Sequence, residues 1–281
     1  MKVRSFLKPS NLKNIKISKP LLFENNGIKY FFHSCKIEAK DTESTGFGVS
    51  RSFETSKNKA IMEAVERLWV PRGDCSYNGS AANFFSSRTQ AGAKLEALER
   101  DVYIRWALGL TGHEIRVQND TCILRIQPVY KDIEVVIAAQ RGFDCVPFGL
   151  AAASTFLNAR EHAFEELTMS LIRHRIGDCS KPQNRYQILH RATCNKLFHE
   201  KIFEPLPFKS GPILKVPHFI FNSYGAQVRW PLKVITASSP NLFIWDLSWF
   251  RDTHNTDHPN ANLFYKKFGT TQIQTDQIFV G

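Results

Sequence analysis

The chain contains two short acidic segments with the same pattern. Residues 63–67 read E-A-V-E-R and residues 96–100 read E-A-L-E-R, so each has two glutamates three apart and an arginine directly after the second. On a helix these three side chains share one face. They can be ordinary solvated faces, each with an ion pair worth about 0.2–0.5 kcal/mol. They can instead form two walls of a cleft, because carboxylates bind Mg²⁺ beside phosphate oxygens and arginine binds phosphate.

Further polar residues have the types that such a cleft needs. Ser80-Ala-Ala-Asn83 precedes the second acidic segment, and small polar residues there form turns, cap helices or bind phosphate and metal-bound water. Later in the chain, His162, Glu166 and Ser170 are spaced four residues apart and form one row on a helix. Glu166 is then either a surface glutamate or another carboxylate of the cleft.

The apolar pattern around these segments predicts the elements that position them. Helical periodicity predicts helices at 57–70, 91–108 and 158–175, and alternating or continuous apolar runs predict strands at 27–39, 121–130, 132–141 and 143–154. The two middle strands should form a hairpin around Lys131 and Asp132. A turn is expected at Gly46–Gly48 and a polar loop at 71–90. Strands and helices alternate in blocks, which favours an α+β (mixed α/β) fold.

Composition limits the class of protein. The 281 residues carry a formal net charge of +11, which favours anionic partners such as nucleotides, nucleic acid or acidic peptides. Six scattered cysteines without a C-x-x-C pair indicate reduced thiols, and no signal peptide or apolar membrane span is found, so we expect a cytoplasmic protein. No boundary divides the chain, and we expect one domain over 1–281, with a basic arm at 1–20 and a weakly patterned part at 181–281.

The order of the motifs resembles the YcaO family, ATP-dependent enzymes that activate backbone amides of ribosomally made peptides. The resemblance covers residues 45–175. The motifs in this range follow in the family's order: a glycine-containing strand, an E-x-x-E-R helix, an S-x-x-N loop, a second E-x-x-E-R-D helix, a strand ending in G-x-A-A and a third glutamate helix. It implies a YcaO-like fold, a β-sheet with helices that carry a glutamate-rich Mg–ATP cleft.

The resemblance also implies a role for each matching residue. Mg²⁺ would be held by four glutamates, and the nucleotide would be oriented by a second set of residues. The metal ligands would be Glu66, Glu96, Glu99 and Glu166, the orienting residues Glu63, Arg67, Arg100, Ser80 and Asn83, and the catalytic residues Glu66, Glu99, Arg100 and His162. His162 replaces the family's arginine and can still donate a hydrogen bond to phosphate. Ser170 replaces a glutamine and can still bind water. The chain departs from the family at Ala60, where a serine is usual, at Arg88, and in lacking a proline-rich tail.

The implied activity is cyclodehydration of Cys, Ser or Thr residues to azolines with ATP and Mg²⁺, as in bacteriocin-like natural products. Thioamide or amidine formation is an alternative within the family, and a degenerate scaffold that binds peptide or partner without ATP turnover is another. The expected partners are a precursor peptide and a leader-binding or E1-like protein, because no leader-binding module is recognisable here. A homodimer is also expected. Nucleic-acid binding ranks last, since it leaves the paired glutamates unexplained.

Overall fold

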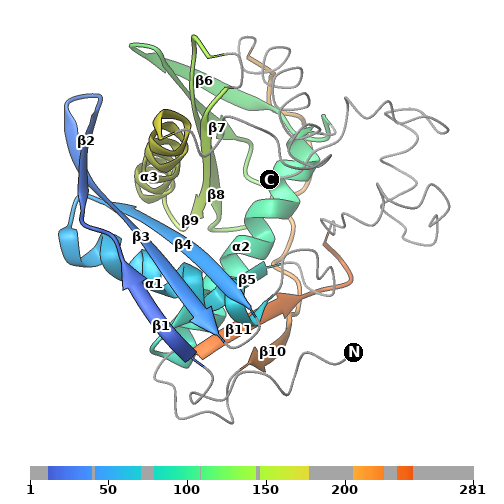
Figure 1. Cartoon of the computed structure of the whole chain (residues 1–281). Coiled ribbons are helices and arrows are strands. Elements are labelled where there is room, and N and C mark those ends of the chain that lie inside the picture. Colours follow the sequence, from blue (N-terminus) through green and yellow to red (C-terminus); the bar gives the residue numbers. More distant parts are fainter. Residues whose placement is uncertain are drawn as a thin grey trace, which may run out of the picture. The chain divides into compact units, whose positions relative to one another are not determined.

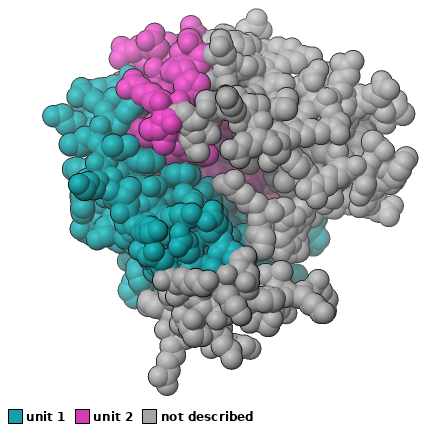
Figure 2. Space-filling model, in the orientation of Figure 1, with its two compact units in different colours: residues 1–98, 218–240 teal, residues 99–217, 241–281 magenta. Residues whose placement is uncertain are grey.

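The protein is described from a computed structural model, which covers residues 12–39, 42–70, 79–107, 109–143, 146–176, 205–224 and 233–242. The chain divides into two compact units (Figure 2). The first consists of residues 1–98 and 218–240, and the second of residues 99–217 and 241–281. The boundary at residues 98 and 99 falls inside helix α2 (Ser86–Ala107), so this helix contributes one half to each unit.

The first unit is built on a long central strand, β3 (Ile28–Ala39). It pairs antiparallel with β4 (Glu43–Ser50) along one side, and with β2 (Leu21–Asn25) and then β1 (Leu12–Ile17) along the other. Helix α1 (Phe53–Trp69) begins at Ser52, whose hydroxyl caps the first turn. The helix lies against β3 and β4 (Figure 1).

A second sheet of the first unit also contacts α1. Its strands run in the order β10 (Ile220–Tyr224), β11 (Lys233–Ser238) and β5 (Gly79–Asn83), all antiparallel. The buried core around α1 therefore combines residues from both sheets, including Ile37, Val65, Leu68 and Val234. Because strand residues alternate between faces, β5 presents one face to α1 and the other to the first half of α2.

The second unit is an antiparallel meander in the order β6 (His113–Gln118), β7 (Thr121–Ile126), β8 (Glu134–Gln140) and β9 (Phe148–Ala153). Helix α3 (Phe156–Arg175) packs on β8 and β9 (Figure 1). The second half of α2 lies on the opposite face of the sheet. There the Tyr103 ring stacks on the Phe148 ring, with 6.4 Å between the ring centroids. Both faces are covered, so β7 and β8 are buried almost throughout.

The predicted elements are largely confirmed, including the α+β class, the long strand, the hairpin and the three helices. Two predictions were wrong. The glycine turn at Gly46–Gly48 is part of strand β4, and the polar loop at 71–90 contains strand β5 and the start of α2. Strand β5 exists because it pairs with β11, which follows it by about 150 residues in the chain, and a local pattern cannot reveal such a partner.

The ends of the chain were predicted with less detail. Residues 12–17, expected within a basic arm, form strand β1, while residues 1–11 lie outside the described part. The weakly patterned part at 181–281 contains strands β10 and β11, and most of the rest of it lies outside the described ranges. The single domain over 1–281 stays a prediction. None of the described helices is long and apolar enough to cross a membrane.

Candidate functional site

Helix α1 approaches strand β4 so closely that the two backbones touch. Gly46 and Gly48 face the helix, and a Cβ atom at either would come within 3.0 Å of backbone atoms of Ser56, Ala60 or Ala64. Glycine is the residue that permits such an approach. On the helix side, the contact is lined by small residues, all fully buried. The contact fixes the rotation of α1 and so determines which of its side chains face the edge of β4.

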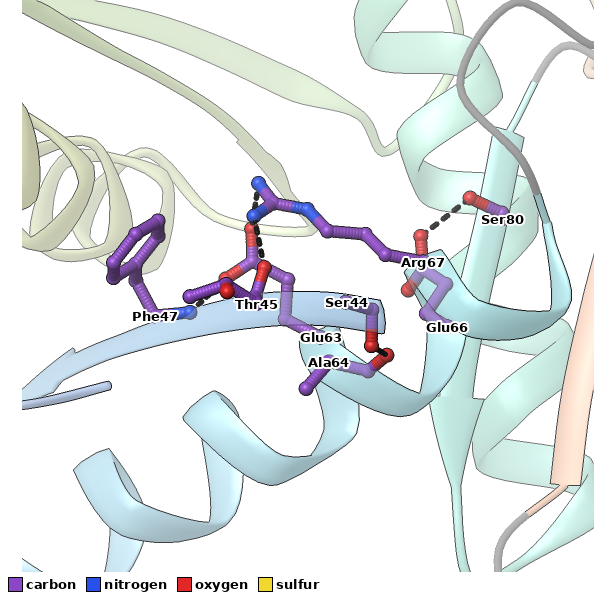
Figure 3. A network of polar contacts seen from close by, with 8 residues as sticks. All are labelled: Ser44, Thr45, Phe47, Glu63, Ala64, Glu66, Arg67 and Ser80. Carbon is purple, nitrogen blue, oxygen red and sulfur yellow. Dashed lines mark hydrogen bonds and ion pairs between the residues drawn. The ribbon is translucent and has the colours of Figure 1, made fainter. Parts of the chain in front are cut away.

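This rotation places Glu63 and Arg67 along the outer edge of β4 (Figure 3). The Glu63 carboxylate accepts a hydrogen bond from the N–H of Phe47, and the Arg67 guanidinium donates to the C=O of Thr45 at 2.5 Å. Glu63 and Arg67 also form an ion pair with each other. An added strand would bind the same two backbone groups, so the ion pair takes its place and closes this edge.

The second glutamate of α1 reaches the next strand in the chain. The hydroxyl of Ser80 donates to the Glu66 carboxylate at 2.5 Å, and the N–H of Ser80 donates to Glu96 on α2 at 2.7 Å. Ser80 is buried between the two half-buried glutamates. Gly79 allows this arrangement, because a Cβ atom there would come within 3.0 Å of the α2 backbone. Glu66, Ser80 and Glu96 thus form one connected polar group inside the first unit.

In the second unit, Glu99 of α2 accepts a hydrogen bond from the N–H of Ala152 in β9 at 2.8 Å. The four glutamates therefore follow one rule. The first of each pair, Glu63 or Glu96, binds the strand before its own helix, and the second, Glu66 or Glu99, binds a later strand. The strands concerned, β4, β5 and β9, are edge strands of the described sheets. The interpretation of the two segments as solvated helix faces is thus wrong, because their carboxylates are half-buried and bonded to strand atoms.

A buried network holds the second half of α2 in place. The fully buried carboxylate of Asp101 accepts hydrogen bonds from the Tyr130 hydroxyl at 2.7 Å and from Nε of Arg105 at 2.6 Å. Burial, together with the negative charge of Asp101, raises the pKa of Tyr130, so its hydroxyl stays protonated and donates. The network fixes the rotation of α2 next to Glu99, and the sequence pattern did not indicate this role.

Helix α3 repeats the close contact between strand and helix. A Cβ atom at Gly149 of β9 would come within 3.0 Å of the Ala163 carbonyl oxygen, the Leu167 nitrogen and the Glu166 Cβ. Glu166 follows the contacted alanine by three residues. Glu63 and Glu96 follow Ala60 and Ala93 by the same distance, and the carbonyls of these two alanines face Gly46 and Gly79. Glu166 therefore occupies the place on its helix that the first glutamate of each E-x-x-E-R pair occupies on its own.

The remaining predicted residues are placed less uniformly. His162 and Ser170 lie one turn to either side of Glu166 on α3, as predicted, with His162 exposed and Ser170 half-buried. Asn83 lies at the end of β5, where its Oδ1 accepts from the N–H of Phe85 at 3.4 Å. Because alternate strand residues point to opposite faces, Asn83 and Ser80 leave β5 on different faces. The predicted S-x-x-N loop is thus a strand that separates its two polar side chains. Arg100 is half-buried on α2.

The metal ligands predicted from the sequence belong to both units, Glu66 and Glu96 to the first and Glu99 and Glu166 to the second. Within the described ranges, no three His, Cys, Asp or Glu side chains gather as they would around a metal ion. The donor type nevertheless fits Mg²⁺, which takes one or two protein carboxylates and completes its shell with water and phosphate oxygens. A carboxylate that accepts one strand hydrogen bond has further lone pairs for a cation.

Comparisons with known proteins identify the fold. No family model and no curated protein matches the sequence. A structure of YcaO from Methanopyrus kandleri bound with AMPPCP and Mg²⁺ matches 79% of this chain and 84% of that chain, with 12% identity and a TM-score of 0.55. A heterocyclase in complex with substrate and cofactor matches 81% of this chain with 10% identity and a TM-score of 0.51.

The chain spans half the length of that heterocyclase, and 84% of the YcaO structure. At identities of 12% and 10%, these matches concern the fold. The mixture of helices and antiparallel sheets is the one that the sequence resemblance implied. The chain has a YcaO-like fold.

Proposed function

We propose that the protein is an ATP- and Mg²⁺-dependent enzyme that activates backbone amides of a ribosomally made peptide. The observation that carries the proposal is the fixed position of the E-x-x-E-R glutamates. Glu63, Glu66, Glu96 and Glu99 are each held by a strand donor rather than left mobile in solvent. A carboxylate needs such a fixed position to present its oxygens to a cation without further loss of conformational freedom.

The fold supports the choice of ligand. The YcaO structure with the same fold was solved with AMPPCP, an ATP analogue, and Mg²⁺. In this chain, Glu66, Glu96, Glu99 and Glu166 would hold Mg²⁺, and Arg100 with His162 would stabilise negative charge on the phosphates. Glu63 and Arg67 would keep α1 seated on β4, and Ser80 would orient Glu66 and Glu96. Asn83 and Ser170 would contact the nucleotide or its bound water.

The proposed reaction is cyclodehydration. A Cys, Ser or Thr side chain of the peptide adds to the carbonyl carbon of the preceding amide, and its proton is released as the oxyanion forms. ATP, when bound, supplies the phosphoryl group that turns this oxygen into a leaving group. Loss of phosphate and of the amide proton leaves an azoline, so each ring costs one ATP and removes one water from the peptide. Thioamide or amidine formation would use the same activation with sulfide or an amine as the nucleophile.

We also propose that the enzyme works with partners. The structure-matched heterocyclase was solved in complex with a substrate, which supports a peptide substrate for this chain. A separate leader-binding or E1-like protein would present the precursor peptide, and the enzyme would form a homodimer. The basic character of the chain, with a net charge of +11, suits an acidic peptide segment.

The test combines the protein with a candidate precursor peptide, its partner protein, ATP and Mg²⁺. We expect the peptide to lose the mass of one water per ring, with one ADP formed for each. Glu99→Gln should abolish both products, because the amide is a neutral and weaker ligand for Mg²⁺. Glu43→Gln is the matched control, since Glu43 is an exposed residue of β4 that pairs with Lys36. ATP hydrolysis that does not depend on the peptide, or the absence of any ATP hydrolysis, would contradict the proposal.

A second candidate is a scaffold that binds peptide or a partner without turning over ATP. It is favoured by the substitution of family residues at Ala60, His162 and Ser170, and by Arg88, which lies over the Phe85 ring at 5.2 Å. The discriminating measurement is the melting temperature with and without Mg·ATP. At 100 times the Kd, a ligand stabilises the folded state by about 2.7 kcal/mol, a shift of several degrees. A scaffold would show no shift.

A further inference from the structure

Strand β11 of the first unit contains a buried hydroxyl group for which the described part of the chain supplies no hydrogen-bond partner. Thr236 of strand β11 has an exposed fraction of 1%, and its Oγ1 atom makes no hydrogen bond in the described part of the chain. A buried hydroxyl without a partner costs stability, because it has lost its hydrogen bonds to water. Valine has the same shape and would avoid this cost, so a threonine here calls for a polar group that binds it.

Pairing places Thr236 beside the candidate site. In the antiparallel ladder of β11 and β5, Thr236 stands directly opposite Ser80. The N–H of Ser80 points away from β11, because it donates to Glu96. The two residues therefore form a pair without hydrogen bonds between their backbones, the type of pair whose side chains lie closest, with Cβ atoms about 4.5–5.5 Å apart.

The two side chains also share a face. Opposite residues of a ladder point to the same side of the sheet, so Thr236 points to the side on which Ser80 meets Glu66 of α1. The neighbours on this face are Val234 and Ala82, which belong to the hydrophobic core around α1. Thr236 and Ser80 are thus two hydroxyl groups side by side next to one carboxylate, in otherwise apolar surroundings.

We propose that Thr236 is a further binding residue of the nucleotide–metal site, and that its hydroxyl accepts a hydrogen bond from a water of the hydrated Mg²⁺ held at Glu66. This inference rests on the proposed function. Mg²⁺ keeps several of its waters when it binds to proteins, and these waters are strong donors that need acceptors. Ser80 already donates its proton to Glu66, and Thr236 extends the same polar row from β5 to β11.

The proposal predicts opposite effects of one substitution on the free and the ligand-bound protein. Thr236→Val should leave the melting temperature of the unliganded protein unchanged or raise it, because an unpaired buried hydroxyl is removed and valine suits a strand. The same variant should bind Mg·ATP about three- to tenfold more weakly, as expected for one lost hydrogen bond. Thr236→Ser should bind like the wild type. Calorimetry and thermal shift measure both effects without requiring turnover.

Thr168→Val is the matched control. Thr168 is equally buried, but its hydroxyl donates to the Phe164 carbonyl at 2.7 Å, so this variant should lose stability and keep its affinity for Mg·ATP. Thr236→Val with wild-type affinity, or with reduced stability in the absence of ligand, would overturn the inference alone. A wild-type protein that binds neither Mg·ATP nor Mn²⁺ would overturn the inference and the proposed function together.

Discussion

At the scale of single residues, the glutamates of the two acidic segments have a structural task beside any catalytic one. Glu63, Glu96 and Glu99 accept N–H groups of edge strands, which otherwise would face solvent or attract another strand. A carboxylate suits this task because it accepts several hydrogen bonds at once. The same property lets it bind a backbone and a cation together, so the two tasks reinforce each other.

A buried histidine of strand β3, next to the first turn of α1, predicts a pH dependence of stability. His33 lies 2.8 Å from the Ser56 hydroxyl, which itself donates to the Phe53 carbonyl at 2.8 Å, so the Nδ1 of His33 donates. Burial, and then the charge of Lys57, lower the pKa of His33 below its ordinary value of 6.5. The unfolded chain therefore binds the proton more readily, and stability should fall as the pH drops below about 6.5.

The measurement is the free energy of unfolding in urea between pH 7.5 and pH 5, for the wild type and for His33→Gln. The variant should be less stable at pH 7.5, because it loses packing and the hydrogen bond to Ser56. Its stability should change less steeply between pH 7 and pH 5 than that of the wild type. Equal slopes for the two proteins would show that His33 does not titrate in this range.

At the scale of elements, one device occurs three times. A strand glycine touches the backbone of a helix at a fully buried alanine, in β4 with α1, in β5 with α2 and in β9 with α3. In each case a glutamate follows the contacted alanine by three residues and lies next to the strand. Close backbone contact leaves little freedom of rotation, so the glycines determine where Glu63, Glu96 and Glu166 lie.

Gly46→Ala tests this device. A Cβ atom at Gly46 would collide with backbone atoms of Ala60 and Ala64, which cannot move without the whole helix. We expect a loss of about 1–3 kcal/mol or more in the free energy of unfolding, and weaker Mg·ATP binding because Glu63 and Glu66 shift with α1. Gly211→Ala is the control, because a Cβ there meets no atom within 4 Å. Denaturation in urea gives the free energy of unfolding of both variants. A Gly46 variant as stable as the Gly211 control would contradict this prediction.

At the scale of the whole molecule, the residues of the proposed site are divided between two compact units joined by α2. Neither unit contains the complete set of proposed metal ligands. The proposed function therefore predicts that Mg·ATP binding depends on residues of each unit.

Matched substitutions in the two units test this dependence. Glu66→Gln changes the first unit and Glu166→Gln the second, and each removes one charge while keeping the size of the side chain. We expect each to weaken Mg·ATP binding by at least about tenfold and to reduce the rise in melting temperature that Mg·ATP causes. An effect of Glu66→Gln without an effect of Glu166→Gln would confine the site to the first unit.

The sequence by itself determined the helices, the long strand, the hairpin and the acidic residues, because periodicity and spacing are local properties of the chain. It also carried the YcaO resemblance, which the fold confirms. Tertiary structure alone decided what the glutamates bind. Glu63, Glu96 and Glu99 accept backbone N–H groups of β4, β5 and β9, and Glu66 accepts the Ser80 hydroxyl, and no local pattern reveals these pairings. The place of Thr236 opposite Ser80 likewise depends on strand pairing between residues 156 positions apart. The free energy of such a pairing comes from burial and hydrogen bonding across the folded chain, and it therefore leaves no local pattern.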